Sequence, residues 1–138
     1  MTDNIPAGFV PVHDPDPVFQ MIGPLYRGAE TAPEAPVFAM RADHRHINKR
    51  QVVHGGMLVS LIDTTLAVAC WNAGGGGPCA TITLNTEFLG PARDGDWLVA
   101  RAEVTRLTRS LVFVKGQLFA GDNLVLTANG VWKRLGAD

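Results

Sequence analysis

The segment HGGMLVSLIDTTLAVACW occupies residues 54–71 and predicts one long helix. It begins with a histidine and two glycines and continues through apolar residues with no wide polar face, which is typical of a buried helix. The exception is Asp63, a carboxylate in the middle of the segment. Because removing a charge from water is costly, a buried acid requires a partner, a shifted pKa or a chemical task.

Length and composition indicate a single domain. The chain has 138 residues, of which 46% are hydrophobic, enough for one core and too few for two. Only 18% are charged, the formal net charge is -1, and no basic run is longer than the pair Lys49-Arg50. We therefore expect neither a nucleic acid nor a membrane as partner, but a small molecule or another copy of the chain.

The N-terminal residues carry no recognisable targeting segment. They lack the basic start and apolar core of a signal peptide, and no uncharged apolar run reaches the ~18 residues of a membrane helix. A soluble cytoplasmic protein is therefore expected. Cys70 and Cys79 fit no metal-ligand or redox spacing, so we expect both to be reduced and to pack as small apolar residues.

Two parts are expected along the chain. Residues 1–34 form an N-terminal arm, because four of the nine prolines fall in residues 1–17, and a short helix within 17–28 that ends at Gly23-Pro24. Residues 35–138 form the domain proper. In order, it contains a strand at 35–42, a polar connection at 43–53, the long helix from His54 or Gly55, and a glycine run at 74–77 that ends this helix.

Strand-like alternation dominates the rest of the chain. Four runs show it, at residues 79–89, 97–107, 111–120 and 124–134. The connections between them are short enough for hairpins, so they predict an antiparallel meander. With the strand at 35–42, this gives one long helix beside an antiparallel sheet of five or six strands, an α+β architecture.

The start of the long helix is a candidate oxyanion site. The first N–H groups of a helix have no internal partner and carry partial positive charge, and glycine lets a ligand approach them closely. Gly55 and Gly56 stand at this point. The alternative is that the two glycines only allow the chain to turn tightly into the helix.

Asp63 is the second candidate, as a general base or nucleophile at a site closed to water. The alternative is a structural carboxylate bound by neighbouring hydroxyls such as Thr64 or Thr65. Eight residues separate Gly55 from Asp63, or about 12 Å along a helix axis, so the two cannot touch one reacting carbon from the same chain. If both act on one substrate, a two-fold dimer must combine the helix start of one copy with the acid of the other.

The connection before the helix holds further polar candidates. His44, His46 and His54 match no closed zinc pattern, so no metal site is expected. Asn48 lies six residues before His54 and could turn its amide toward a carbonyl at the helix start, although asparagine in loops often stabilises its own turn. His54 either marks the beginning of the helix or also contacts the ligand.

Together these residues resemble a known family. Asn48-x5-His54-Gly55-Gly56-x6-Asp63, followed by the strand end EFLGPA at residues 87–92, is similar to the hotdog-fold acyl-CoA thioesterases of the PaaI type. The similarity spans roughly residues 35–134. It implies a hotdog fold and hydrolysis of acyl-CoA to free acid and CoA, with no metal or redox cofactor, in a homo-oligomer that is commonly a dimer of dimers.

The resemblance also assigns roles to residues. Gly55 and Asn48 would polarise the thioester carbonyl, and Asp63 of the neighbouring subunit would act as base or nucleophile, assisted by the hydroxyl of Thr81. His54 is a further catalytic candidate, and Gly56 is a candidate for substrate binding. Arg109-Ser110, in a predicted hairpin, could meet a CoA phosphate, although an exposed turn arginine is more often simply solvated.

The sequence departs from the family pattern at two positions, and two other functions are possible alternatives. The glycine usual three residues before the histidine is Gln51 here, and simple alternation puts Thr81 on the polar strand face with Thr83. An acyl-thioester hydratase on the same fold would need an Asp and a His, for which Asp43 and His46 are the candidates. A non-catalytic acyl-binding module is the other alternative. The depth of the acyl pocket would depend on apolar residues such as Trp71, Phe88 and Leu89.

Overall fold

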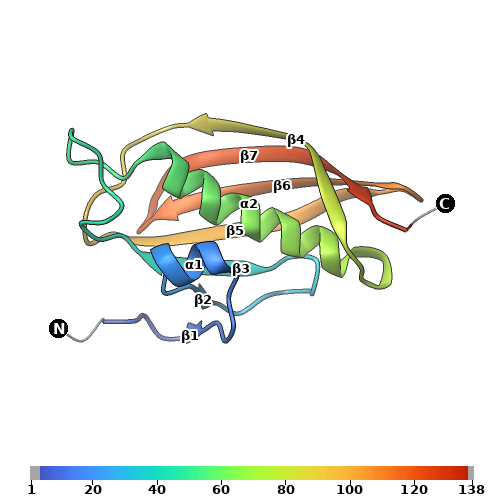
Figure 1. Cartoon of the computed structure of the whole chain (residues 1–138), viewed down its shortest axis with the longest axis horizontal. Helices are drawn as coiled ribbons and strands as arrows, with labels where there is room; N and C mark the ends of the chain where they lie inside the picture. The colour runs from blue at the N-terminus through green and yellow to red at the C-terminus, as the bar shows by residue number, and fades with distance from the viewer. Residues whose placement is uncertain (1–3, 137–138) are drawn as a thin grey trace.

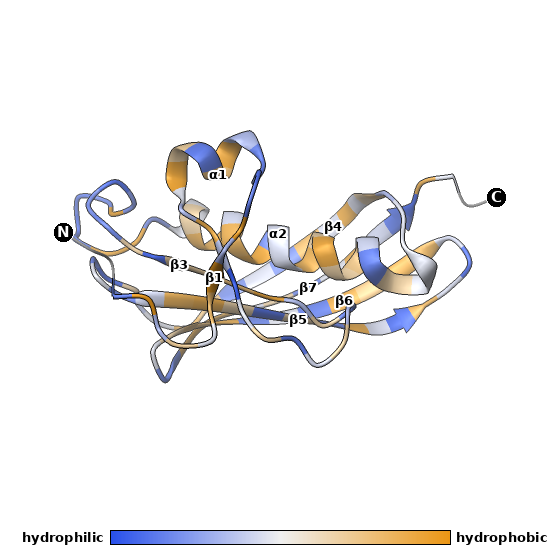
Figure 2. Cartoon of the chain, turned by 90° about the horizontal axis from the view of Figure 1, so that it is seen from below, coloured by the Kyte–Doolittle hydropathy of each residue, from blue (hydrophilic) through white to orange (hydrophobic). Residues whose placement is uncertain are grey.

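One long helix, α2 (Gly55–Asn72), lies across one face of an antiparallel sheet in the computed structural model, which describes residues 4–136 (Figure 1). The sequence also forms a short helix, α1 (Pro17–Ile22), and a 3-10 turn, η1 (Ala73–Gly75). The strands are β1 (Val10–Pro11), β2 (Tyr26–Arg27), β3 (Val37–Arg41), β4 (Cys79–Phe88), β5 (Trp97–Leu107), β6 (Leu111–Ala120) and β7 (Asn123–Arg134). Figure 2 shows both helices on the same side of the sheet.

The sheet confirms the predicted α+β class, with a strand order of β1-β2-β3-β5-β6-β7-β4. Its seven strands exceed the expected five or six because two-residue strands, β1 and β2, extend the edge beside β3. The long strands lie within about two residues of their predicted bounds. The predicted meander is correct for β5, β6 and β7, which pair in succession.

The meander prediction is wrong for β4. This strand pairs with β7 at the far edge of the sheet and not with β5, the next strand in the sequence. The connection at residues 89–96 therefore passes the ends of β7 and β6 to reach β5, and it contacts the segment just before α2. There the Val53 N–H donates to the Ala92 carbonyl at 2.7 Å, and buried Ala92 anchors the connection to the core.

The core lies between α2 and the sheet. Leu61, Ile62 and Leu66 of α2 are fully buried and belong to one cluster with Leu118 of β6 and Trp132 of β7. By length and composition α2 and the following turn could span a membrane, but the burial of these side chains identifies it as a core helix.

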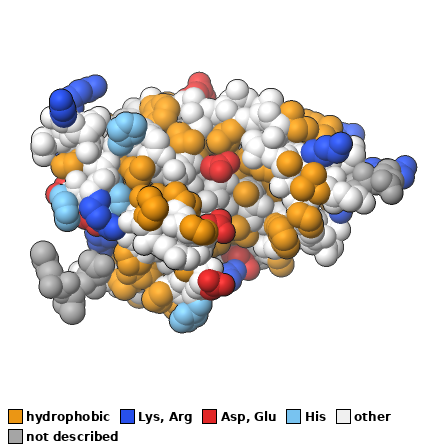
Figure 3. Space-filling view, in the orientation of Figure 1, with side chains coloured by type: hydrophobic (Ala, Val, Ile, Leu, Met, Phe, Trp, Pro, Cys, Tyr) orange, Lys and Arg blue, Asp and Glu red, His pale blue; other side chains and the backbone are white. Residues whose placement is uncertain are grey.

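The expectation that α2 is buried all round is wrong. Val59, Asp63 and Ala67 are only partly buried, and the Trp71 side chain is 54% exposed. These positions recur every four residues and therefore line one stripe of the helix. In the orientation of Figure 1, apolar side chains show on the surface over α2 (Figure 3). A single copy of the chain thus leaves one stripe of its central helix, apolar except for Asp63, partly uncovered.

The strand β4 is also open. It is an edge strand of ten residues, and most of its side chains are exposed, including Ile82 at 55% and Phe88 at 54%. A long edge strand with unpaired backbone groups is a template for pairing with another strand.

Candidate active site

Capping by His54 shapes the start of α2. The ring Nδ1 of His54 accepts the Gly56 N–H at 3.0 Å, and its carbonyl accepts from Met57 at 2.9 Å and Leu58 at 3.4 Å. Within residues 4–136, the Gly55 N–H has no hydrogen-bond acceptor. Of the first four helix donors, which normally lack internal partners, Gly55 is therefore the one available to a ligand. The side chain of His54 serves as a cap, and the Gly56 N–H is taken by it.

A tight hairpin brings Asn48 back to the helix start. The His54 N–H donates to the His46 carbonyl at 2.8 Å, Ile47 bridges Val53, and the Asn48 N–H donates to Val52 at 2.8 Å. The side-chain oxygen of Asn48 accepts from the backbone of Arg50 at 2.8 Å. This contact stabilises its own turn and leaves the amide nitrogen as the end that can donate to a carbonyl.

Gln51 keeps the turn that the missing glycine would make. Its φ is +65°, in the left-handed region where glycine is normally found, and its N–H donates to the Asn48 carbonyl at 3.0 Å. The substitution therefore preserves the path of the hairpin around Asn48, at a cost in local backbone strain.

Asp63 lies partly buried on α2 without a hydrogen bond or ion pair to any of the residues described here. The Thr65 hydroxyl is not its partner, because it donates to the Leu61 carbonyl at 2.8 Å, and Thr64 makes no hydrogen bond to Asp63 within residues 4–136. Burial raises the pKa of Asp63 above its ordinary value of 3.8. A carboxylate that is short of water and unpaired has the character of a general base.

A β-bulge moves Thr81 to the helix side of the sheet. Simple alternation predicts Thr81 and Thr83 on one face, but the register shifts between them: Thr81 pairs with Trp132 and Thr83 with Val131. Directly paired residues share a face, and Trp132 is buried in the core beside α2. The prediction of a polar-face position for Thr81 is therefore wrong, and its hydroxyl lies on the same side of the sheet as Asp63. Periodicity contains no signal for the extra residue.

The hairpin with Arg109 and Ser110 lies at the opposite end of α2 from Gly55. Arg134 connects this hairpin to the end of the helix, because its guanidinium donates to the Arg109 carbonyl at 3.4 Å and to the Gly74 carbonyl at 3.1 Å. The helix has 18 residues, or roughly 27 Å of rise. Within one chain, Arg109 and Ser110 are thus far from the Gly55 N–H.

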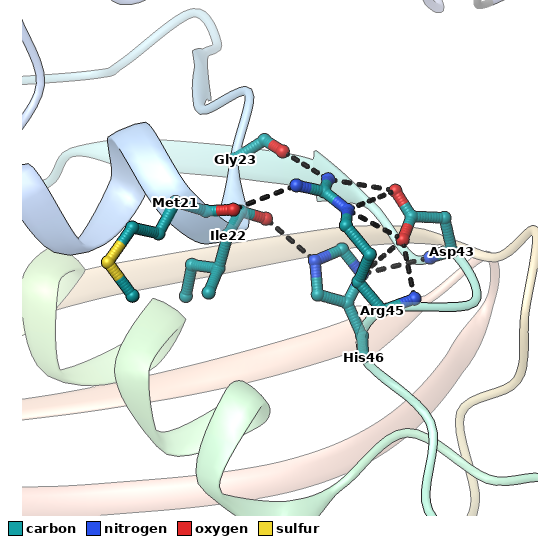
Figure 4. Close-up of polar contacts among 6 residues, drawn as sticks. All are labelled: Met21, Ile22, Gly23, Asp43, Arg45 and His46. Carbon is teal, nitrogen blue, oxygen red and sulfur yellow. Dashed lines mark hydrogen bonds and ion pairs between the residues drawn. The ribbon is translucent and has the colours of Figure 1, made fainter.

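Asp43, Arg45 and His46 form a clamp that holds the end of α1 (Figure 4). Arg45 donates to both oxygens of Asp43, and its terminal nitrogens donate to the carbonyls of Met21 at 2.8 Å and Gly23 at 2.5 Å. The Arg45 hydrogen bond is the main reason why the pKa of Asp43 falls from 3.8 to about 2. No sequence pattern indicated that these groups would meet α1, since more than twenty residues separate them.

The two residues that a hydratase would need, Asp43 and His46, are both engaged in this clamp. His46 is 1% exposed; its Nδ1 accepts the Asp43 N–H at 2.9 Å and its Nε2 lies 2.6 Å from the Ile22 carbonyl. Because both ring nitrogens are bound to backbone groups, His46 has no site left for moving a substrate proton or binding a metal. Asp43 is held by Arg45. This geometry argues against a hydratase centre at these residues.

Comparisons with known proteins identify the family. Residues 50–127 match the family model of the thioesterase superfamily. A Pseudomonas aeruginosa protein named as a presumptive esterase is 34% identical over 130 residues, covering 94% of this chain and 96% of that protein. Mouse acyl-coenzyme A thioesterase 13 is 29% identical over 89 residues, covering 63% of this chain and 62% of that enzyme.

Solved structures of the same type share the fold. A mutant form of the phenylacetic acid degradation protein PaaI from Thermus thermophilus superimposes with a TM-score of 0.79 at 26% identity, covering 87% of this chain and 100% of that one. Sequence family, strand order and helix position thus agree with the resemblance drawn from the HGG motif. The chain belongs to the thioesterase superfamily and is a hotdog-fold thioester hydrolase of the PaaI type.

Proposed function

We propose that the chain hydrolyses acyl-CoA thioesters to free acid and CoA at sites that two copies of the chain share. One observation carries this proposal: the Gly55 N–H and the Asp63 carboxylate, both without a partner within residues 4–136, lie on one uninterrupted helix. Eight residues of rise, about 12 Å, keep them from one carbonyl carbon. Each is therefore half of a site that a second chain completes.

The Gly55 N–H supplies the oxyanion half. As a free donor at the positive end of α2 it would bind the thioester oxygen as negative charge develops there. Asn48, whose own turn fixes the amide oxygen, would add its amide N–H. The cap by His54 holds the helix start rigid, so the donor is aligned before the substrate arrives.

Asp63 of the other copy supplies the base. Its raised pKa, caused by burial, makes it a stronger base than an exposed aspartate. It would take a proton from water while the water oxygen attacks the carbonyl carbon, and the thiolate of CoA would leave with the bonding electron pair and be protonated. Alternatively, the carboxylate would attack that carbon itself and expel the thiolate, and water would then cleave the resulting acyl-aspartate anhydride to release the free acid and restore Asp63. The Thr81 hydroxyl, on the same side of the sheet, would orient the carboxylate.

The open edge of β4 and the uncovered stripe of α2 support the dimer. Antiparallel pairing of β4 with its copy would continue the sheet and set two α2 helices side by side in opposite directions. Gly55 of one chain then faces Asp63 of the other when the two-fold axis passes near Val59, midway between them. Val59 lies on the uncovered stripe.

The same arrangement would bring Arg109 and Ser110 into reach of the CoA bound at the shared site. They lie at the C-terminal end of α2, which in this antiparallel pair of helices extends roughly 13 Å past the start of the partner helix, on the side toward which the CoA arm would lead. There they would meet a phosphate of the CoA bound to the other chain. We further propose a dimer of dimers in the cytoplasm, with no metal or redox cofactor.

Mixing two inactive variants tests the shared site. Asp63→Asn and Gly55→Pro remove one half each, so each homodimer should release little thiol from acyl-CoA. In a mixed dimer, one of the two sites combines an intact Gly55 with an intact Asp63. Co-refolding equal amounts should restore about a quarter of wild-type activity, because about half of the dimers are mixed and half of their sites are intact.

Two results would reject the proposal separately. If the co-refolded mixture is no more active than the separate variants while the wild type is active, both groups act from one chain and the shared site is wrong. If the wild type itself releases no thiol from a panel of acyl-CoAs, measured with a thiol-reactive dye, acyl-CoA is not the substrate. Wild type mixed with each variant in the same way is the control for refolding yield.

A further inference from the structure

The ring of Phe88 lies against Gly55. A side-chain Cβ placed on Gly55 would lie 3.2 Å from Cε1 and 3.3 Å from Cζ of Phe88, closer than most real contacts of this kind. The ring of the last residue in β4 therefore fills the space that a side chain at the helix start would take. A side chain at position 55 would therefore require the Phe88 ring to move by a few tenths of an ångström.

The position of this ring is fixed, but the ring is not part of the core. Phe88 pairs with Leu126 of β7, and the next residue, Leu89, donates its N–H to the Val125 carbonyl at 2.9 Å. The backbone below the ring is therefore held on one side by the sheet. The side chain is nevertheless 54% exposed. In the single chain, about half of this large apolar ring is thus uncovered, and it lies beside Gly55, whose N–H has no acceptor in the described chain.

We propose that Phe88 determines which acyl groups the enzyme accepts, by packing against the acyl carbon next to the thioester carbonyl. The inference rests on Gly55 as the oxyanion donor. A carbonyl oxygen about 2.9 Å from that N–H places the carbonyl carbon about 4 Å from the nitrogen. A ring in contact with Gly55 is then a neighbour of the substituents on that carbon.

The ring of Phe88 is better suited to contact the acyl group of the substrate than its CoA part. The exposed half of the Phe88 ring is apolar, and burying hydrocarbon against it is favourable, whereas the pantetheine arm carries amide groups that require hydrogen bonds. The sheet fixes the backbone below the ring, and Gly55 at the start of α2 borders the ring on one side. A methyl branch on the first acyl carbon would therefore collide with it.

Hydrolysis of butyryl-CoA and isobutyryl-CoA tests the inference. These substrates have the same number of carbons and differ in branching next to the carbonyl. We expect the wild type to prefer the linear acyl group at least tenfold in kcat/KM. Phe88→Ala should reduce this preference about tenfold, mainly by gaining activity on isobutyryl-CoA, and Phe88→Leu should lie between them. Val10→Ala changes an apolar side chain of similar exposure, 56%, at the opposite edge of the sheet and should change nothing.

The outcomes separate this inference from the proposed function. An unchanged preference in Phe88→Ala and Phe88→Leu, with an active wild type, overturns the role of Phe88 alone. Repeating the assay with N-acetylcysteamine thioesters removes most of CoA; a change in preference seen with CoA but not with these esters would place the ring on the CoA side and also overturn it. A wild type inactive on both CoA esters rejects the proposed function instead.

A double variant checks the contact itself. Gly55→Ala should lower the melting temperature because its Cβ meets the Phe88 ring. Adding Phe88→Ala should recover most of that loss, because the ring is then absent. If the two effects simply add, the ring does not press on Gly55 and the inference fails.

Discussion

The Nδ1 atom of His54 accepts the N–H of Gly56 at 3.0 Å. Gly56 carries the second backbone N–H of α2, and this contact gives it an acceptor. The His54 carbonyl accepts the third and fourth, from Met57 and Leu58. The first donor, on Gly55, is therefore the one that can bind a developing oxyanion. A single residue thus both begins the helix and selects which of its N–H groups reaches the substrate.

Gly55→Pro should abolish most activity with little effect on the fold. Proline is favoured at the first helical position, and His54, with φ -59° and ψ 133°, already has the conformation preferred before proline. We expect kcat to fall about 10²- to 10³-fold, the usual cost of one oxyanion donor. Gly55→Ala is the matched control, since it adds the same Cβ near Phe88 but keeps the N–H. Equal loss in both variants would show that crowding, not the donor, matters.

Asp63→Asn should raise stability and remove activity. Burial raises the pKa of Asp63 above 3.8, so as the pH rises the unfolded chain ionises first and the folded chain loses stability between the two pKa values. At pH 7 the variant should therefore melt at a higher temperature than the wild type, and the difference should shrink as the pH falls toward 4. Thiol release should fall about 10²- to 10⁴-fold. A lower melting temperature at pH 7 would mean that the carboxylate has a stabilising partner.

His46→Ala should loosen the N-terminal arm. The variant leaves the Ile22 carbonyl and the Asp43 N–H without their partner, and each unsatisfied buried group costs about 1–3 kcal/mol. Urea unfolding should show this loss, and proteolysis should cut within residues 13–24 first. His44→Ala, at an exposed neighbouring position, should stay within about 0.5 kcal/mol of the wild type. Matching stabilities for the two variants would contradict the clamp.

Gln51→Gly should relieve strain in the hairpin before α2. The φ of +65° costs a residue with a side chain about 1–2 kcal/mol, partly offset by the greater freedom of glycine in the unfolded chain. We expect a net gain of up to about 1 kcal/mol with activity retained. Gln51→Val should be destabilised, because a β-branched residue tolerates this conformation least. Thermal unfolding of both variants would decide, and a loss on Gln51→Gly would show that the glutamine side chain stabilises the turn.

Hydrophobic periodicity was sufficient to predict the long helix and the five longer strands, but not the two-residue strands β1 and β2. The apolar run from Gly55, the glycines that end the helix and the alternating runs after it depend on neighbours in the sequence, so local physics determines them. The distance between Gly55 and Asp63 is also determined locally, because the rise per residue of a helix is constant. It yielded the hypothesis of a shared site without knowledge of the fold.

Other features depend on contacts between distant segments. The bulge that turns Thr81 toward α2 adds one unpaired residue that no periodicity marks. The pairing of β4 with β7 rather than β5 depends on where the helix lies on the sheet.

The local sequence therefore determined that a long helix begins with a free donor and carries an acid two turns later. Only the tertiary structure decided that the acid has no partner within the described chain, that Asp43 and His46 hold α1 instead of forming a catalytic pair, and that Phe88 stands beside Gly55. The physical reason is that burial and pairing are properties of groups far apart in sequence, whereas helix rise and capping act within a few residues.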